Sequence, residues 1–207
     1  MSETTGILAI VSGFSGAGKG TLMHELLSRY EGYSLSVSAT TRKPREGEMD
    51  GRDYFFIGRE EFERMISEHA FIEYARYVDN YYGTPKKYVE DQLAAGKDVI
   101  LEIEVQGAMI VKQQYPDAIT VFVTPPNAAE LKRRLEGRKT EAADVIAGRL
   151  KRAGEESELM AMYDYLLVND DLQESTKKLH DIITNAHARM NANGEFVSRI
   201  QRELRAM

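Results

Sequence analysis

A glycine-rich run over residues 13–21 is the part of this sequence whose residue types and spacing point most directly to chemistry. Glycines let backbone N–H groups turn inward around phosphate oxygens, and a helix that begins there adds a partial positive charge. Lys19 can then reach the β- and γ-phosphates of a nucleotide. The run therefore predicts a nucleotide phosphate-binding loop formed by Gly13, Phe14, Ser15, Gly16, Ala17, Gly18, Lys19, Gly20 and Thr21.

The sequence on either side of this loop supports the prediction. Residues 7–11 are a short apolar run typical of a buried parallel strand, and Leu22 and Leu26 begin a helical pattern after the loop. One position departs from the usual pattern, because Gly20 follows the lysine where a Ser or Thr normally contacts Mg²⁺. Thr21, one residue later, is the alternative magnesium ligand that the sequence offers.

Further apolar runs predict the sheet that holds the loop. Residues 99–103, 119–123 and 165–168 are separated by stretches long enough for crossover helices. This alternation favours an α/β fold with a parallel sheet flanked by helices. Glu102 and Glu104 stand two residues apart at the end of one run, so we expect them to share a face at the carboxyl edge of the sheet. Carboxylates there can organise magnesium-bound water or meet a substrate.

Two segments interrupt the alternation. Residues 35–90 are rich in Tyr, Phe, Thr and Arg and show one helical pattern near 60–68, which predicts an inserted, mainly β subdomain. Residues 127–149 begin with a helical pattern and continue into a polar stretch, which predicts a mobile helical lid. We expect a single domain over 1–207, with its core formed by residues 1–34, 91–126 and 150–207.

The last residues have a helical pattern of their own. Phe196, Val197, Ile200 and Leu204 recur at helical spacing, which places them on one face of a helix. We therefore expect residues 196–207 to pack against the rest of the domain.

The composition excludes several classes of function. A chain of 207 residues with 43% hydrophobic content can form one domain with a substantial core. The net charge of -6 opposes binding to nucleic acid or to an anionic membrane, so we expect neither partner. The absence of cysteine excludes disulfides, thiolate metal sites and thiol nucleophiles. No basic segment opens the sequence and residues 7–11 are too few for a signal or transmembrane segment, so we expect a cytoplasmic protein.

Five ordered blocks resemble the guanylate kinase family. They cover residues 36–48, 51–56, 71–74, 80–84 and 102–107, and with the phosphate loop the resemblance runs from Ile7 to about residue 190. It implies a P-loop NTPase-like core, a GMP-binding subdomain and a lid, with ATP and GMP as substrates and Mg²⁺ as cofactor. The expected reaction transfers the γ-phosphoryl group of ATP to GMP, and also to dGMP, in purine nucleotide metabolism.

The resemblance also implies roles for individual residues. Two arginines and two tyrosines are expected to hold the phosphate of GMP, and this suits a dianion because all four side chains are donors. An ionised Glu73 would accept from N1–H and the 2-amino group of guanine, whereas adenine presents an unprotonated N1. The implied GMP-binding residues are Ser38, Arg42, Arg45, Glu48, Tyr54, Glu73, Tyr82, Thr84, Glu102 and Glu104. The implied catalytic residues are Lys19, Arg42, Arg134, Arg138 and Arg149, and Arg138 and Asn169 join the phosphate loop in binding ATP.

Two other functions compete with this interpretation. Some guanylate kinase-like domains are catalytically inactive binding modules, but these typically lack an intact phosphate loop. A kinase for another nucleoside monophosphate is suggested by the sequence Gly-Lys-Gly-Thr at residues 18–21, which also occurs in adenylate kinases. The acceptor blocks oppose that second alternative. A homo-oligomer is compatible with the sequence.

Overall fold

The computed structural model describes residues 5–77, 79–137 and 143–207, and its main sheet has five parallel strands in the order β2-β7-β1-β8-β9. Four of these strands coincide with the apolar runs of the sequence, which confirms the predicted parallel sheet. The strands are β1 (Leu8–Gly13), β2 (Tyr33–Leu35), β7 (Asp98–Glu102), β8 (Ile119–Thr124) and β9 (Tyr165–Val168).

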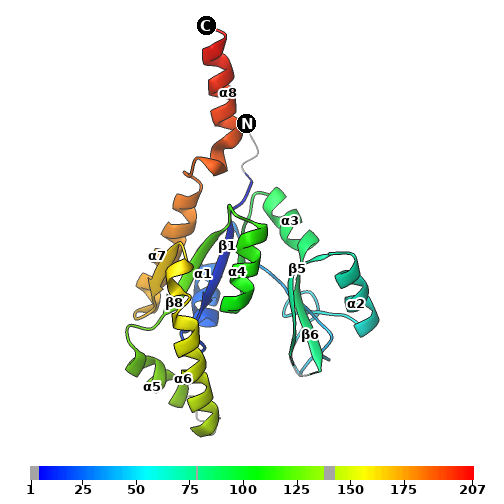
Figure 1. The fold of residues 1–207 in the computed structure, drawn as a ribbon, viewed down its shortest axis with the longest axis vertical. Coiled ribbons are helices and arrows are strands. Elements are labelled where there is room, and N and C mark those ends of the chain that lie inside the picture. The colour runs from blue at the N-terminus through cyan, green and yellow to red at the C-terminus, as the bar shows by residue number, and fades with distance from the viewer. Residues whose placement is uncertain (1–4, 78, 138–142) are drawn as a thin grey trace.

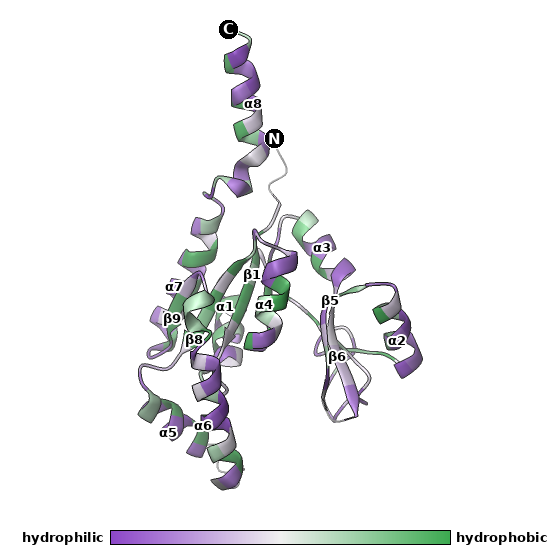
Figure 2. Cartoon of the chain, in the orientation of Figure 1, coloured by the Kyte–Doolittle hydropathy of each residue, from purple (hydrophilic) through white to green (hydrophobic). Residues whose placement is uncertain are grey.

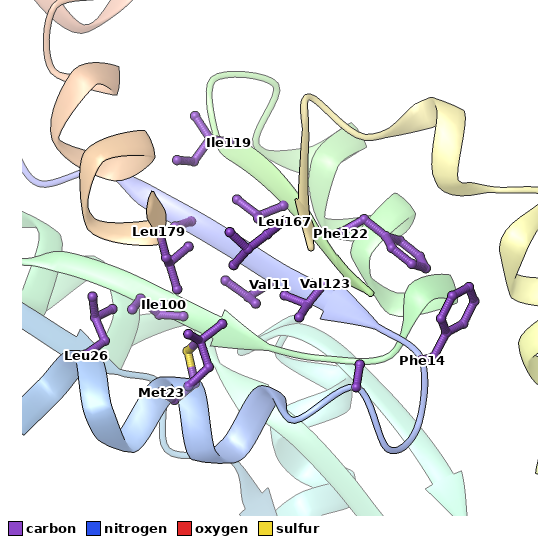
Figure 3. Close-up of a cluster of buried hydrophobic side chains, with 14 of the residues drawn as sticks. Val11, Phe14, Met23, Leu26, Ile100, Ile119, Phe122, Val123, Leu167 and Leu179 are labelled. Atoms are coloured by element: carbon purple, nitrogen blue, oxygen red, sulfur yellow. The ribbon is translucent and has the colours of Figure 1, made fainter. Parts of the chain in front are cut away.

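Helices cover both faces of this sheet (Figure 1), because successive residues of a buried strand point to opposite sides. Ala9 and Val11 of β1 pack with α1 (Lys19–Arg29) and α7 (Leu172–Ala186) in the cluster drawn in Figure 3. Leu8 and Ile10 pack on the other face with α3 (Lys86–Ala94) and α4 (Val105–Gln114). The hydrophobic colouring of the strands in Figure 2 agrees with a sheet buried on both faces.

A second, four-stranded sheet confirms the predicted β-rich insertion. Its order is β4-β3-β6-β5, and it is mixed because β3 pairs parallel with β4 but antiparallel with β6. Phe62 stacks on Phe71 and Tyr81 with ring centroids 4.3 and 5.1 Å apart, which gives this sheet a small core of its own. The elements are β3 (Ala39–Thr40), β4 (Phe55–Phe56), α2 (Arg59–Ser67), β5 (Phe71–Tyr77) and β6 (Asn80–Pro85).

Two helices follow β8 in the region where the sequence predicts a lid. They are α5 (Ala128–Glu136) and α6 (Ala143–Ser157), and the short helix η1 (Met160–Met162) leads from them into β9. In Figure 1 these helices lie on one side of the main sheet and the second sheet lies on the other.

The C-terminal helix does not pack as the sequence led us to expect. Helix α8 (Gly194–Arg205) follows the short helix η2 (Asn191–Asn193) and extends away from the main sheet in Figure 1. Phe196, Ile200 and Leu204 are exposed, so the prediction that residues 196–207 pack on the domain is wrong for this single chain. The apolar spacing predicted an amphipathic helix correctly but contained no information about which surface covers it. Within the described ranges, no helix has both the length and the hydropathy needed to cross a membrane.

Candidate active site

The carboxyl ends of the parallel strands bring the candidate site together at one edge of the main sheet. Gly13 ends β1, Glu102 ends β7, Thr124 ends β8 and Val168 ends β9. Since all of these strands run in the same direction, the residues that follow them are neighbours in space although they are distant in sequence.

The phosphate loop joins β1 to α1, as the sequence predicts, and Lys19 is the first residue of that helix. Its ammonium group donates to the carbonyl oxygens of Gly13 at 2.6 Å and Phe14 at 3.2 Å. The lysine therefore lies folded over its own loop, in reach of a phosphate bound there. Gly18 precedes the helix with a φ of 90°, a conformation that favours glycine.

Asn169, directly after β9, holds the phosphate loop by a hydrogen bond. Its side chain is buried, and its Nδ2 donates to the carbonyl oxygen of Ala17 at 2.8 Å. A Cβ on Gly18 would lie only 2.6 Å from the same nitrogen, so the close approach also needs a glycine. The resemblance implies that Asn169 binds ATP, and the structure shows its side chain bonded to the loop backbone.

Arg134 of α5 completes this contact. Its Nη2 donates to the carbonyl oxygen of Asn169 at 3.0 Å, and its Nη1 lies 3.4 Å from the carbonyl oxygen of Ala17. Its Nε donates to Glu130 at 2.6 Å, and hydrogen bonds from Arg133 and Arg134 lower the pKa of Glu130 to about 2. A lid-region arginine thus bridges α5, the phosphate loop and the end of β9.

A cavity of about 650 Å³ lies beside this bridge. Its size falls within the range of small-molecule sites, roughly 300–1,000 Å³. Both acidic and basic groups line the cavity. It can therefore present hydrogen-bond acceptors as well as donors to the base of a nucleotide. The lining residues are Pro126, Asn127, Ala129, Glu130, Arg133, Arg134 and Asp170.

The other predicted lid arginine that the structure describes also reaches the loop. The Nη1 of Arg149, on α6, donates to the hydroxyl of Ser15 at 2.9 Å. Arg138 lies outside the described residues, so its predicted role stays a prediction.

Gly20 and Thr21 lie at the open side of the loop. Thr21 is exposed in the first turn of α1, and a Cβ placed on Gly20 would meet nothing within 4 Å. Within the described ranges, no group of three or more His, Cys, Asp or Glu side chains could hold a metal ion.

Arg42, in the second sheet's loop region, is held by Glu48. Its two terminal nitrogens donate to the two carboxylate oxygens at 2.9 and 2.8 Å, and the backbone N–H of Arg45 donates to Glu48 at 2.7 Å. These bonds, with Arg42 the larger cause, lower the pKa of Glu48, and the same carboxylate raises the pKa of Arg42. The pair stays ionised at neutral pH.

Two aromatic hydroxyl residues gather around this guanidinium. The Arg42 carbon Cζ lies 5.3 Å from the ring centroid of Tyr54, and Tyr54 meets Tyr82 edge to face with centroids 6.1 Å apart. Arg42, Tyr54 and Tyr82, three of the four predicted phosphate ligands, therefore belong to one cluster of donors, and Arg45 is joined to it through its backbone bond to Glu48.

Glu73 and Thr84 face each other across the β5–β6 pair. The Thr84 hydroxyl donates to Oε1 of Glu73 at 2.7 Å. Burial raises the pKa of Glu73, and the bonds from Thr84 oppose that rise. Oε2 lies 3.8 Å from where a Cβ on Gly107 would be, an ordinary van der Waals distance, so the carboxylate approaches α4 beside the main sheet. Ser38 lies near the start of β3, where its carbonyl oxygen accepts from the N–H of Phe55 at 2.9 Å.

Glu102 and Glu104 occupy different environments, contrary to the prediction that they share a strand face. β7 ends at Glu102. Burial raises the pKa of this carboxyl above its ordinary value, and the nearby charge of Lys19 opposes part of that rise. Glu104 is the residue before α4, and its side chain is 73% exposed. Arg152 of α6 donates to Glu104 at 2.9 Å. The chain turns into the helix too early for two-residue spacing to keep both carboxylates on one face.

Comparison with known proteins identifies the family of this arrangement. The guanylate kinase family model matches residues 6–186. The chain belongs to the guanylate kinase family. Curated guanylate kinases of Streptococcus mutans and Enterococcus faecalis are 50% and 49% identical over 206 and 203 residues. These alignments cover 99% and 97% of this chain and 98% and 99% of the two relatives. A guanylate kinase crystal structure from Anaplasma phagocytophilum superposes with a TM-score of 0.70 at 33% identity, covering 90% of this chain and 88% of that one.

Some contacts in this guanylate kinase family member were not predicted from the sequence. Glu130 and Arg134 stand four residues apart, as do Arg152 and Glu156, and helical spacing of opposite charges was the signal available for both pairs. That spacing predicts a surface ion pair. It gives no indication that Arg134 also reaches the phosphate loop or that Arg152 also reaches Glu104.

Proposed function

We propose that this chain is a guanylate kinase, which transfers the γ-phosphoryl group of ATP to GMP, and also to dGMP, to give ADP and GDP. The observation that carries the proposal is the half-buried Glu73 carboxylate, held by Thr84 on the second sheet and directed toward α4. A phosphate-binding loop by itself would fit many kinases. The pair of Glu73 and Thr84 supports a specificity of the acceptor site for guanine.

Guanine recognition depends on the charge of Glu73. An ionised carboxylate only accepts hydrogen bonds, and guanine presents N1–H and the 2-amino group as neighbouring donors. The pKa of Glu73 is raised by burial in the absence of these donors. Two charge-assisted bonds from guanine favour the ionised form, while adenine would place an acceptor against the same oxygens. Thr84 fixes the orientation of the carboxylate, and we place Ser38 beside the same base.

The phosphate of GMP would be bound by Arg42, Arg45, Tyr54 and Tyr82. Glu48 accepts hydrogen bonds from both terminal nitrogens of Arg42. We therefore propose that Glu48 orients the arginine and does not itself contact the anionic phosphate. A phosphate dianion carries more charge than a carboxylate and can compete for these donors. The acceptor oxygen then lies between two sets of cations, one from each sheet.

On the donor side, the loop backbone and Lys19 would bind the β- and γ-phosphates of ATP. Phosphoryl transfer builds charge on the oxygens of the transferring group, and arginines that stabilise this charge contribute on the order of 10³ to 10⁵ in rate. We assign this role to Arg134, Arg138 and Arg149. Asn169 shapes the loop, and the cavity beside Asp170 is the proposed site of the ATP base.

We propose that Mg²⁺ accompanies ATP. Mg²⁺ prefers oxygen ligands and keeps several waters, and the exposed Thr21 hydroxyl and the Glu102 carboxylate near Lys19 suit this preference. When bound, the ion would neutralise charge on the β- and γ-phosphate oxygens. Glu104 is a further oxygen donor at this edge, and water can connect either carboxylate to the ion.

We place the reaction in the cytoplasm and in purine nucleotide metabolism, including the recycling of GMP. Net charge makes nucleic acid an unsuitable partner. The inactive binding module is the remaining alternative from another class, and the intact loop with Lys19 opposes it.

One comparison of substrates tests the proposal. Purified protein is given ATP and Mg²⁺ with GMP, dGMP, AMP, CMP or dTMP, and ADP formation is measured. We expect efficient turnover with the two guanine nucleotides alone. Turnover with AMP at a similar kcat/KM would overturn the acceptor assignment, and no ADP formation above background with any acceptor would support the inactive binding module.

A further inference from the structure

Arg152 of α6 lies between two carboxylates that belong to different elements. Its Nη2 donates to Oε2 of Glu104, the residue before α4, at 2.9 Å. Its Nε donates to Oε1 of Glu156, on its own helix, at 3.1 Å. One guanidinium therefore joins α6 to the connection between β7 and α4. Neither Arg152 nor Glu156 has a part in the phosphoryl transfer described above.

The two carboxylates repel each other. Glu156 is largely buried, with 12% of its side chain exposed. Burial raises the pKa of this carboxyl, the charge of Glu104 raises it further, and the bond from Arg152 opposes the rise. Arg152 thus turns a repulsion between α4 and α6 into an attraction. Because Glu156 is shielded from water, the repulsion left without Arg152 costs more than the loss of an exposed ion pair.

A cavity of about 310 Å³ lies beside these contacts, between α4 and α6. Gln106 of α4 lines one side, and charged residues of α6, among them Lys151 and Glu155, line the other. Leu159 is the one large apolar side chain in this lining, so apolar packing contributes little across the gap. The attraction between the two helices at this point therefore depends on charged groups such as Arg152.

The face of α6 that carries Arg152 also carries Arg149. At 100° per residue, Arg149, Arg152 and Glu156 fall within an arc of about 60°. Arg149 donates to the hydroxyl of Ser15 in the phosphate loop at 2.9 Å, so α6 contacts the loop through one arginine and Glu104 through the other. We propose that Arg152 is a positioning residue, which stands between Glu104 and Glu156 and keeps α6 close enough to α4 for Arg149 to reach the loop.

The consequence for catalysis rests on the proposed function, in which Arg149 stabilises the transferring phosphoryl group. Without Arg152, the two carboxylates push α6 away from α4, and Arg149 moves with its helix. A displacement of about 1 Å in a catalytic group can cost a large part of its contribution to the rate. The loss of Arg152 should therefore lower kcat more than it raises the KM of either substrate.

Hydrogen exchange of the full chain tests the link between the helices without reference to activity. We expect Arg152→Gln to raise the exchange rates of amides in α6 and to leave those of α7 unchanged. Arg64→Gln is the matched control, because it removes the same side chain from an exposed helical ion pair with Glu61. It should leave exchange in α6 at the wild-type rates. If α6 exchanges at the wild-type rates in Arg152→Gln as well, the proposal is overturned.

A second substitution tests the repulsion. Glu156→Gln removes one of the two like charges, so adding it to Arg152→Gln should return exchange in α6 toward the wild type although both bonds of Arg152 are lost. The kcat with GMP should fall about tenfold in Arg152→Gln and recover to within about threefold of the wild type in the double variant. A double variant as impaired as Arg152→Gln in both measurements would overturn the proposal.

The two measurements also separate this proposal from the proposed function. A wild type that does not phosphorylate GMP would count against the proposed function, and the exchange rates of α6 would still decide on Arg152. A wild type that phosphorylates GMP, with Arg152→Gln equal to it in kcat and in exchange, would count against Arg152 alone.

Discussion

The side-chain amide of Asn169, directly after β9, donates to the carbonyl oxygen of Ala17 in the phosphate loop at 2.8 Å. Arg134 donates to the backbone carbonyl of Asn169 at 3.0 Å. The two contacts connect the end of one strand, the loop after another and a lid-region helix. Asn169 is therefore a positioning residue for the loop in our account of ATP binding.

Asn169→Asp should impair the use of ATP, because it replaces the donor by a charged acceptor facing the Ala17 carbonyl. We expect kcat/KM for ATP to fall at least tenfold, about 1.4 kcal/mol, while the KM for GMP changes little. Asn185→Asp on the exposed part of α7 makes the same chemical change away from the loop and serves as the control. An equal rise in the KM values of both substrates would argue for a general structural defect instead.

Lys19→Ala should leave a folded protein with turnover reduced at least a hundredfold. This corresponds to about 2.7 kcal/mol, the loss expected when one preorganised charge contact to the transferring group disappears. Steady-state kinetics at saturating ATP and GMP measure it, with Lys178→Ala on the exposed side of α7 as the control. Near-normal turnover in a folded Lys19→Ala protein would remove the loop lysine from the mechanism.

The position of Gly20 makes a specific prediction about magnesium. Gly20→Ser should be tolerated, because a Cβ there meets nothing within 4 Å. Thr21→Val, which removes a hydroxyl at nearly constant shape, should raise the Mg²⁺ concentration needed for half-maximal rate. Titrations of Mg²⁺ at fixed ATP measure both effects. If Thr21→Val titrates like the wild type, water or the carboxylates Glu102 and Glu104 hold the ion.

The rate should depend on pH through Glu73. Burial raises the pKa of this carboxyl in the free protein, and guanine requires the ionised form. As the pH falls through this raised pKa, kcat/KM for GMP should therefore decrease, at a pH above the ordinary range of a glutamate. The profile of kcat/KM against pH for GMP measures this limb. If kcat/KM for GMP instead stays constant as the pH falls to the ordinary pKa range of a glutamate, Glu73 is not the titrating group.

The main sheet and the phosphate loop could be predicted because their signals are local. Continuous apolar runs indicate buried parallel strands, and the loop pattern gains meaning from the strand and helix beside it. The β-rich insertion was also predictable from its composition, although the pairing of Glu73 with Thr84 depends on the register of two strands.

Contacts between distant residues could not be predicted in the same way. Asn169 and Ala17 are 152 positions apart, and nothing in either segment specifies that an amide will meet a backbone carbonyl. The packing of α8 was predicted wrongly because an apolar stripe indicates burial without naming the covering surface. Glu104 was misplaced because β7 ends at Glu102, two residues before the strand pattern would require.

The central claim, that a half-buried carboxylate on the second sheet selects guanine, is tested most directly by Glu73→Gln. The measurement is the ratio of kcat/KM for GMP to kcat/KM for AMP, in the wild type, in Glu73→Gln and in the exposed control Glu68→Gln. Glutamine keeps the shape but presents a donor amide where guanine needs acceptors. We predict that kcat/KM for GMP falls by a hundredfold or more, about 2.7 kcal/mol, that the ratio narrows, and that the KM for ATP changes little. A Glu73→Gln protein with the wild-type efficiency and the wild-type ratio would contradict the account and leave guanine to be read by Ser38, Thr84 or Glu104.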